Sequence, residues 1–272
     1  MNILDKIIAH KKEEVEKRKL LCPVKELEKS VYFTTPCVSL KQSLLDESKS
    51  GIIAEFKRKS PSKGIINKYA SVEQTTAGYV KAGASALSIL TDTEFFGGRN
   101  EDVTIARRLN SSPILRKDFM IDEYQIIEAK SIGADVILLL ANVLSPNEIR
   151  SFAQIAKSLS MQVLLEIREK EELNSICHEV DAVGVNNRNL KDFSVNVNQS
   201  FELSDLIPNE FIKISESGID SAKIIHDLKN AGFKGFLIGE TFMKHKQPEI
   251  ACAEFINNLS LTLPEGEERI TP

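Results

Sequence analysis

Short apolar segments recur along this chain at regular intervals, and they constrain its fold more than any other feature. Their first residues lie 20 to 34 residues apart, and each segment has the length and composition of a buried β-strand. The eight segments are IIAEF from Ile52, ALSIL from Ala86, PIL from Pro113, DVILLLA from Asp135, QVLLEI from Gln162, AVGV from Ala182, FIKI from Phe211 and GFLIG from Gly235. Strands that are apolar on both faces are typical of a parallel sheet covered by helices.

The intervals between these segments carry helical periodicity, which is clearest at 71–84, 121–134, 145–159 and 220–233. Three of the helices are predicted to end at a glycine, because a left-handed residue lets the chain turn into the next strand: Gly83, Gly133 and Gly232. Eight strand–helix units match a (β/α)8 TIM barrel better than an open doubly wound sheet, which has about five or six strands.

The predicted organisation is one α/β domain over 1–272, with an N-terminal helical extension at 1–50, the barrel at 51–260 and a polar tail at 261–272. The extension opens with a predicted helix whose apolar residues fall largely along one stripe: Ile3, Leu4, Ile7, Ile8 and Val15. A helix packed on the barrel is the favoured interpretation, and a functional lid is the alternative.

Charge and cysteine content limit the surroundings in which the protein works. A formal net charge of -4 gives no basic field for nucleic acid or for an anionic membrane. The four cysteines form no CxxC pair, and no signal peptide opens the chain, so a reduced, cytoplasmic protein is expected. The longest apolar run, Val136–Ala141, is far shorter than the about 20 residues that span a bilayer.

Polar side chains stand near the ends of five predicted strands, on the face that carries apolar residues earlier in the same strand. Alternate strand residues share a face, so Glu55 and Lys57 point the same way as Ile53. By the same rule, the others are Lys117 with Leu115, Glu166 with Leu164, Asn186 and Arg188 with Gly184, and Glu216 with Ile214. If Ile53 faces the barrel interior, these side chains meet at the mouth where barrel enzymes have their active sites.

Two interpretations of this charged rim remain open at this point. Buried salt bridges would explain any one pair, but five charges with an Asn and an Arg at one rim favour a functional site. The glycine-containing loops SESGI and LIGET, at 215–219 and 237–241, follow the last two strands, where barrels commonly bind phosphate. Neither loop is specific alone, because glycine after a strand is usually a turn residue.

Missing motifs narrow the chemistry further. The four histidines lie outside the strand ends, and the sequence has no HExxH, GxSxG or Cys/His cluster. A Ser-His-Asp hydrolase and a zinc enzyme are therefore disfavoured. Neither GxGxxG nor a Walker A motif is present, so nothing indicates a nucleotide or dinucleotide.

Eight motifs in order along nearly the whole chain resemble the indole-3-glycerol phosphate synthase family of tryptophan biosynthesis. They are IIAEFKRKSPSKG, ALSILTDTEFFGG, PILRKDFMIDEYQI, GADVILLL, LLEIREKEEL, GVNNRNL, ISESGI and FLIGETFM. The resemblance implies a carboxy-lyase that converts 1-(2-carboxyphenylamino)-1-deoxyribulose 5-phosphate into indole-3-glycerol phosphate, carbon dioxide and water. It implies a small phosphorylated substrate, no cofactor and no metal, and a weak association with other tryptophan-pathway enzymes.

The resemblance also implies a role for each matching residue. Lys117 is the general acid, Lys57 holds the anthranilate carboxylate and shares acid duty, and Glu166 acts in the second stage. Glu55 and Asn186 orient the lysines and the intermediate hydroxyls. The implied substrate contacts are Ser60, Ser217, Gly218, Gly239 and Glu240 for the phosphate, Phe96, Phe119, Leu138, Leu140 and Leu190 for the anthranilate ring, and Arg188 and Glu216 along the site.

A lysine with the ordinary pKa of about 10.4 is a poor proton donor at neutral pH, so a lowered pKa in the lysine pair is our hypothesis. One rival is phosphoribosylanthranilate isomerase, which would require an acid/base Cys and Asp at strand ends where this chain has Glu55 and Lys57. Another is a non-catalytic barrel that binds a phosphorylated ligand. A pure binder would gain nothing obvious from buried acid/base residues. An acidic Glu240 beside a phosphate dianion is expected to point away from it.

Overall fold

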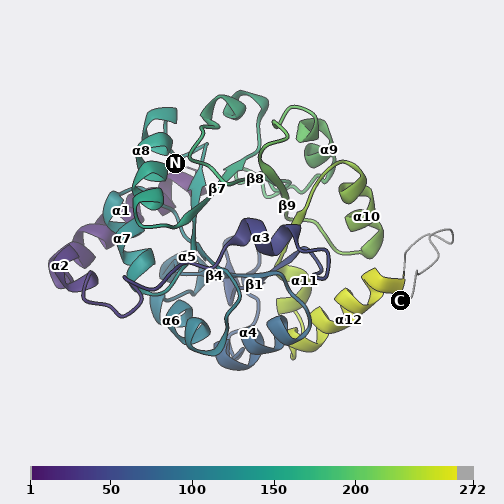
Figure 1. Cartoon of the computed structure of the whole chain (residues 1–272), viewed down its shortest axis with the longest axis horizontal. Helices are drawn as coiled ribbons and strands as arrows, with labels where there is room; N and C mark the ends of the chain where they lie inside the picture. Colours follow the sequence, from purple (N-terminus) through teal and green to yellow (C-terminus); the bar gives the residue numbers. More distant parts are fainter. Residues whose placement is uncertain (1, 262–272) are drawn as a thin grey trace.

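The eight predicted strands close into one parallel barrel in a computed structural model, which describes residues 2–261 (Figure 1). Around the barrel the strands follow the order β1-β10-β9-β8-β7-β6-β5-β4, so sequence neighbours are also spatial neighbours. The ring and its outer helices confirm the predicted (β/α)8 TIM barrel with an N-terminal helical extension.

The barrel strands begin and end within two residues of the predicted segments. Their bounds are β1 (Ile52–Phe56), β4 (Ala86–Leu90), β5 (Ile114–Lys117), β6 (Val136–Leu140), β7 (Gln162–Ile167), β8 (Ala182–Asn186), β9 (Ile212–Glu216) and β10 (Gly235–Ile238). The pattern did not predict the small antiparallel hairpin of β2 (Lys59–Ser60) and β3 (Gly64–Ile65), which lies in the loop after β1.

Helices follow the strands, and the longer ones cover the outside of the barrel. They are α4 (Val72–Lys81), α5 (Thr93–Phe96), α6 (Asn100–Leu109), α7 (Glu123–Ser131), α8 (Pro146–Ser158), α9 (Asn198–Ser204), α10 (Ala222–Asn230), α11 (Glu240–Met243) and α12 (Pro248–Leu261). Between β7 and β8 the expected helix is replaced by a short 3-10 helix, η1 (Lys170–Ser175). The glycines after α4, α7 and α10 have positive φ, which confirms the predicted C-terminal turns.

Alternation along each strand divides the apolar side chains into two layers. Ile53 packs in the barrel interior with residues such as Leu115 and Leu164. Its neighbours Ile52 and Ala54 point outward and pack under the helices. The interior assignment of Ile53 is therefore confirmed, and with it the direction of the charged residues that follow on the same face.

The extension consists of α1 (Ile3–Leu21), α2 (Val24–Leu27) and α3 (Leu40–Leu45). Helix α3 lies across the ring in Figure 1, and its Leu40 and Leu44 join the interior cluster at the N-terminal ends of the strands. Among the described residues, no helix is both long and apolar enough to cross a bilayer. The predicted tail at 261–272 begins at the last described residue and otherwise lies outside the described residues.

A lysine interrupts the apolar stripe by which α1 packs on the barrel. Lys11 lies between the buried Ile7 and Val15 and is itself fully buried. Its Nζ lies 2.9 Å from both Asp92 and Asp118, which follow β4 and β5. Burial opposes the charged form of Lys11, but the charges of Asp118, Asp92 and Glu14 outweigh burial and raise its pKa above the usual value.

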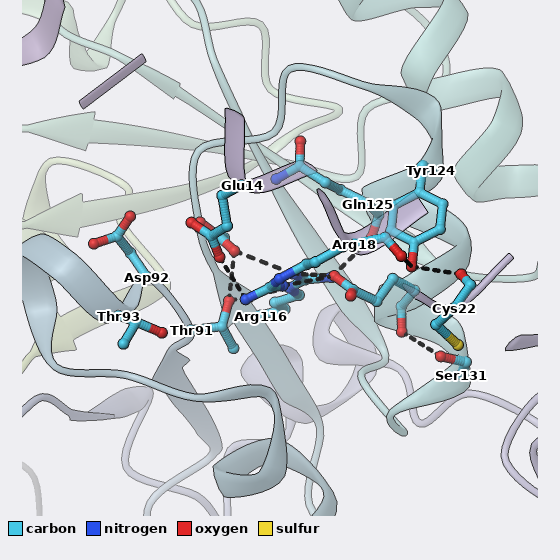
Figure 2. A network of polar contacts seen from close by, with 12 residues as sticks. Glu14, Arg18, Cys22, Thr91, Asp92, Thr93, Arg116, Tyr124, Gln125 and Ser131 are labelled. Carbon is cyan, nitrogen blue, oxygen red and sulfur yellow. Dashed lines mark hydrogen bonds and ion pairs between the residues drawn. The ribbon is translucent and has the colours of Figure 1, made fainter. Parts of the chain in front are cut away.

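Two arginines extend this ion-pair network from α1 to β5 and α7 (Figure 2). Arg116 is fully buried, and its Nη2 lies 2.6 Å from Glu128 and 3.1 Å from Asp118. Arg18 on α1 binds the same Glu128 at 3.0 Å and Glu14 at 2.5 Å. The helix that opens the chain is therefore tied to the strand that carries Lys117.

Candidate active site

A cavity of about 490 Å³ opens at the C-terminal ends of the barrel strands. Every residue predicted for the site lines it, from the acid/base cluster to the apolar and phosphate-binding positions: Glu55, Lys57, Ser60, Phe96, Lys117, Phe119, Leu138, Leu140, Glu166, Asn186, Arg188, Leu190, Glu216, Ser217, Gly218, Gly239 and Glu240. These residues come from the ends of all eight barrel strands and from the loops that follow them, which meet at this mouth of the barrel.

Lys117 stands at the centre of the charged cluster, on the last residue of β5. Its Nζ donates hydrogen bonds to Glu166 Oε2 at 3.0 Å and to Glu216 Oε2. Asn186 Nδ2 donates to the other oxygen of Glu166 at 2.8 Å. Both oxygens of Glu166 are therefore engaged, and the carboxylate has a fixed orientation.

A second lysine lies on the neighbouring part of the rim. Lys57 Nζ donates to Glu55 Oε1 at 2.6 Å, and the Lys57 side chain is 18% exposed against 14% for Lys117. Because burial of Lys57 is incomplete and its single carboxylate partner lies deeper, its ammonium remains available to an anion entering from the mouth.

Two glycines make room for the interior carboxylates. A Cβ at Gly184 on β8 would collide with Glu216, and a Cβ at Gly239 after β10 would collide with Glu55. Any side chain at these positions would displace a carboxylate from the cluster. Neither glycine has a positive φ, so backbone conformation does not require glycine here. Glycine is required because a side chain would have no room.

The predicted lowering of the lysine pKa is wrong for Lys117. Burial does oppose the charged form of this lysine, but the carboxylates of Glu166, Glu216 and Glu55 outweigh burial and raise its pKa above the usual 10.5. The hypothesis from the sequence considered the repulsion between the two lysine charges. It left out the three carboxylates that surround Lys117. Lys117 is therefore fully protonated at neutral pH.

At Glu216, in contrast to Lys117, the effect of burial on the pKa is larger than the effect of the opposite charge. Its side chain is 2% exposed, and burial raises its pKa from 4.5 to about 7, with Lys117 opposing this shift and Glu166 adding to it. A proton on Glu216 would remove one of the negative charges that hold the Lys117 ammonium. Protonation of Glu216 near neutral pH would therefore make the Lys117 ammonium a stronger acid.

The raised pKa of Glu216 predicts a pH-dependent stability. Between pH 4.5 and about 7 the folded protein binds more protons at this group than the unfolded chain, so stability falls as pH rises through this window. From pH 5 to pH 8, we expect the free energy of unfolding to fall by about 1–3 kcal/mol less in Glu216→Gln than in the unmodified protein. Urea unfolding at both pH values measures the difference.

The exposed Glu210, just before β9, provides the matched control for this substitution. Glu210→Gln should keep the pH dependence of the unmodified protein, because it removes an exposed carboxyl and leaves Glu216 in place. If Glu216→Gln and Glu210→Gln show the same pH dependence as the parent, then Glu216 is not a proton-binding group in this pH range.

The predicted phosphate-binding residues lie together in another part of the cavity wall. Ser217 and Gly218 both have positive φ, 68° and 75°, and Gly239 directly precedes α11. Glu240 carries its carboxylate toward two cations, with Arg188 Nη2 at 3.3 Å and Lys63 Nζ at 3.6 Å. This acidic side chain is therefore neutralised by Arg188 and Lys63 at the cavity wall.

An apolar wall closes the third side of the cavity. The rings of Phe96 and Phe119 lie 5.9 Å apart between centroids, and Leu138 and Leu140 continue the surface along β6. Leu190, from the loop after β8, completes the predicted set. A flat aromatic group fits such a wall because aromatic pairs favour tilted or stacked contacts.

Several cavity residues were missed from the sequence. Ile3, Leu4 and Ile7 of α1 line the cavity, although packing on the barrel was the favoured interpretation of their stripe and a functional lid the alternative. The first turn of the extension is therefore both packed on the barrel and part of the site. Lys63 and Lys244 also line the cavity, and a count of basic residues in the loops after β1 and β10 would have suggested them.

Comparisons with known proteins agree with this geometry. A family model described as indole-3-glycerol phosphate synthase matches residues 4–255. A protein of that name from Bacteroides thetaiotaomicron is 46% identical over 255 residues, which cover 94% of this chain and 98% of the relative. Another, from Campylobacter jejuni, is 40% identical over 249 residues, covering 90% of this chain and 96% of the relative.

A solved structure shows the same fold at low sequence identity. Thiamine phosphate pyrophosphorylase from Pyrococcus furiosus aligns with a TM-score of 0.59 and 15% identity, over 83% of this chain and 100% of that chain. At this identity the likeness concerns the barrel alone.

Proposed function

The chain belongs to the indole-3-glycerol phosphate synthase family, and from this premise we propose which residues carry out the reaction. The substrate is 1-(2-carboxyphenylamino)-1-deoxyribulose 5-phosphate, and the products are indole-3-glycerol phosphate, carbon dioxide and water. The reaction forms one carbon–carbon bond, breaks the bond to the carboxylate carbon, and then expels a hydroxyl group as water.

In the first step the aromatic carbon that bears the carboxylate attacks the ribulose carbonyl carbon. Lys117 donates a proton to the carbonyl oxygen, which becomes a hydroxyl group as the ring closes. The support is the position of this protonated ammonium in the cavity, held by Glu166 and Glu216. When Glu216 takes up a proton, the Lys117 ammonium loses one stabilising charge and becomes a stronger acid.

Lys57 holds the anthranilate carboxylate during this step. Its ammonium is partly exposed and has one carboxylate partner, Glu55, at 2.6 Å. An ion pair to the substrate carboxylate fixes the attacking carbon against the carbonyl. Carbon dioxide leaves once the new bond has formed, because its loss restores the aromatic ring.

The second stage removes water from the ring-closed intermediate. Glu166 serves this stage, since its carboxylate is oriented by Lys117 on one oxygen and by Asn186 on the other. The leaving hydroxyl needs a proton, and the neighbouring carbon or nitrogen must lose one, so an acid and a base within one hydrogen-bonded cluster suit the step. Asn186 is held in turn by the N–H of Arg188, at 2.9 Å.

The remaining residues bind the two ends of the substrate. The wall of Phe96, Phe119 and the leucines takes the anthranilate ring. Ser60, the Ser217–Gly218 turn and Gly239 surround the phosphate, with Arg188 and Lys63 nearby as cations. Glu240 balances those two cations in the absence of a ligand. The barrel thus binds a small phosphorylated substrate by both ends and places the reacting atoms at Lys117.

The observation that carries this proposal is the placement of Lys117 between Glu166 and Glu216 at the bottom of a cavity with one apolar and one cationic end. The test is incubation of the purified protein with 1-(2-carboxyphenylamino)-1-deoxyribulose 5-phosphate in metal-free buffer. We expect indole fluorescence to appear together with an equal amount of carbon dioxide.

Two other results would favour the alternatives. Binding of the substrate by the folded protein with no turnover would support a non-catalytic phosphate-ligand barrel. Turnover of phosphoribosylanthranilate without formation of indole would support the isomerase. A cytoplasmic location and a weak association with other enzymes of tryptophan biosynthesis stay predictions of the sequence and of the resemblance.

A further inference from the structure

A fully buried asparagine stands behind the phosphate end of the cavity. Asn187 follows β8 directly, and alternation turns its side chain away from the interior that its neighbour Asn186 faces. The amide uses its full hydrogen-bonding capacity: Nδ2 donates to Ser215 Oγ at 3.1 Å and to Ser217 O at 3.0 Å, and Oδ1 accepts from Ser200 N at 3.2 Å and Ser200 Oγ at 2.9 Å.

The turn that Asn187 contacts has an unfavourable backbone. Ser217 has φ of 68°, a left-handed conformation that a residue with a Cβ seldom adopts and that persists only when its surroundings enforce it. Gly218 follows with φ of 75°, and a Cβ there would collide with Val195. The turn therefore depends on external hydrogen bonds to keep its shape.

Asn187 supplies two of these hydrogen bonds, to consecutive carbonyl groups. Its backbone N–H donates to Glu216 O at 2.9 Å, and its side chain donates to Ser217 O at 3.0 Å. In a trans peptide the carbonyl and the following N–H point in opposite directions. The N–H groups of Ser217 and Gly218 are thereby directed away from Asn187, on the side where both residues line the cavity.

We infer that Asn187 is a positioning residue that directs the Ser217 and Gly218 N–H groups at the substrate phosphate. This inference rests on the proposed function, which places the phosphate at this turn. Asn187 lies behind the turn and does not line the cavity, so its effect passes through the backbone of the turn. No reacting atom touches it, and it should therefore act on phosphate affinity rather than on the chemical steps.

Asn187→Asp is the sharpest test, because the new side chain has the same shape but cannot donate when ionised. The Ser217 carbonyl would then face a carboxylate oxygen. We expect KM for the substrate to rise about tenfold, while kcat stays within about threefold. The dissociation constant of inorganic phosphate, measured by titration calorimetry, should rise by a similar factor.

Asn196→Asp is the matched control. It introduces the same charge in the same loop region, but Asn196 is exposed, and its Oδ1 only accepts the N–H of Asn198, which a carboxylate can also do. KM, kcat and phosphate affinity should match those of the parent. Equal losses of phosphate affinity in Asn187→Asp and Asn196→Asp would overturn the inference, because added charge alone would then explain both.

Ser200→Ala gives a second route if Asn187→Asp does not fold. It removes the hydroxyl that bonds Asn187 Oδ1 and leaves the Ser200 N–H in place, so we expect a smaller rise in KM with kcat unchanged. A fall in kcat at unchanged KM and unchanged phosphate affinity, in either variant, would contradict the positioning role. The phosphate titration needs no turnover, so it tests Asn187 even if the parent lacks the proposed activity.

Discussion

Replacing Lys117 with methionine is expected to reduce the rate of ring closure by at least about 10²–10⁴, the usual contribution of a general acid. Methionine has a similar length but can neither donate a proton nor hold a charge. Lys117 is the only lysine that contacts both Glu166 and Glu216 among the described residues, so no other side chain in that part of the chain is placed to replace it. Indole fluorescence under saturating substrate measures the loss.

Lys117→Arg separates proton donation from electrostatic stabilisation. Arginine keeps a positive charge between the two carboxylates but does not release its proton in proteins. We expect Lys117→Arg to be nearly as inactive as Lys117→Met, with both variants folded by circular dichroism. Activity of Lys117→Arg within tenfold of the parent would show that charge at this position matters and that Lys117 is not the acid.

Replacing Lys11 with methionine is expected to lower the free energy of unfolding by about 3–5 kcal/mol, the usual cost of removing one partner from a buried ion pair. Methionine fits the apolar stripe between Ile7 and Val15, so the loss would come from Asp92 and Asp118, which are fully buried. Urea unfolding at neutral pH measures the change.

Lys19→Met on the same helix is the control. Lys19 also forms ion pairs, with Asp122 at 2.6 Å and Glu16 at 2.9 Å, but its side chain is 34% exposed. Pairs of this kind contribute about 0–1 kcal/mol, because water screens them. Equal losses in Lys11→Met and Lys19→Met would show that burial does not decide the contribution of these pairs.

The interior carboxylates and Lys117 could be predicted from the sequence, because the backbone itself fixes which strand residues share a face. The interior direction of Glu166 and Glu216 follows from the sequence because each stands two residues after an apolar residue of the same strand. The predicted substrate-binding positions came from the resemblance, and in the structure these residues line one cavity.

Other features depend on contacts that no local pattern contains. Lys11 occupies an apolar stripe because its partners Asp92 and Asp118 lie about eighty and a hundred residues further along the chain. The pKa of Lys117 depends on its burial and on its combined charge interactions with three carboxylates from different strands. Asn187 differs from its neighbour Asn186 only in direction, and its role appears only when the turn at Ser217 is seen beside it.

The first turn of α1 also decides how the protein should be handled at the bench. Asn2 caps this helix by exchanging hydrogen bonds with Asp5, and Ile3 and Leu4 form part of the cavity wall directly after it. A purification tag, a dye or a surface tether joined to the first turn of α1 would therefore lie next to residues that line the cavity. A group attached at the end of α12, which lies at the outer edge of the barrel in Figure 1, would be remote from that first turn.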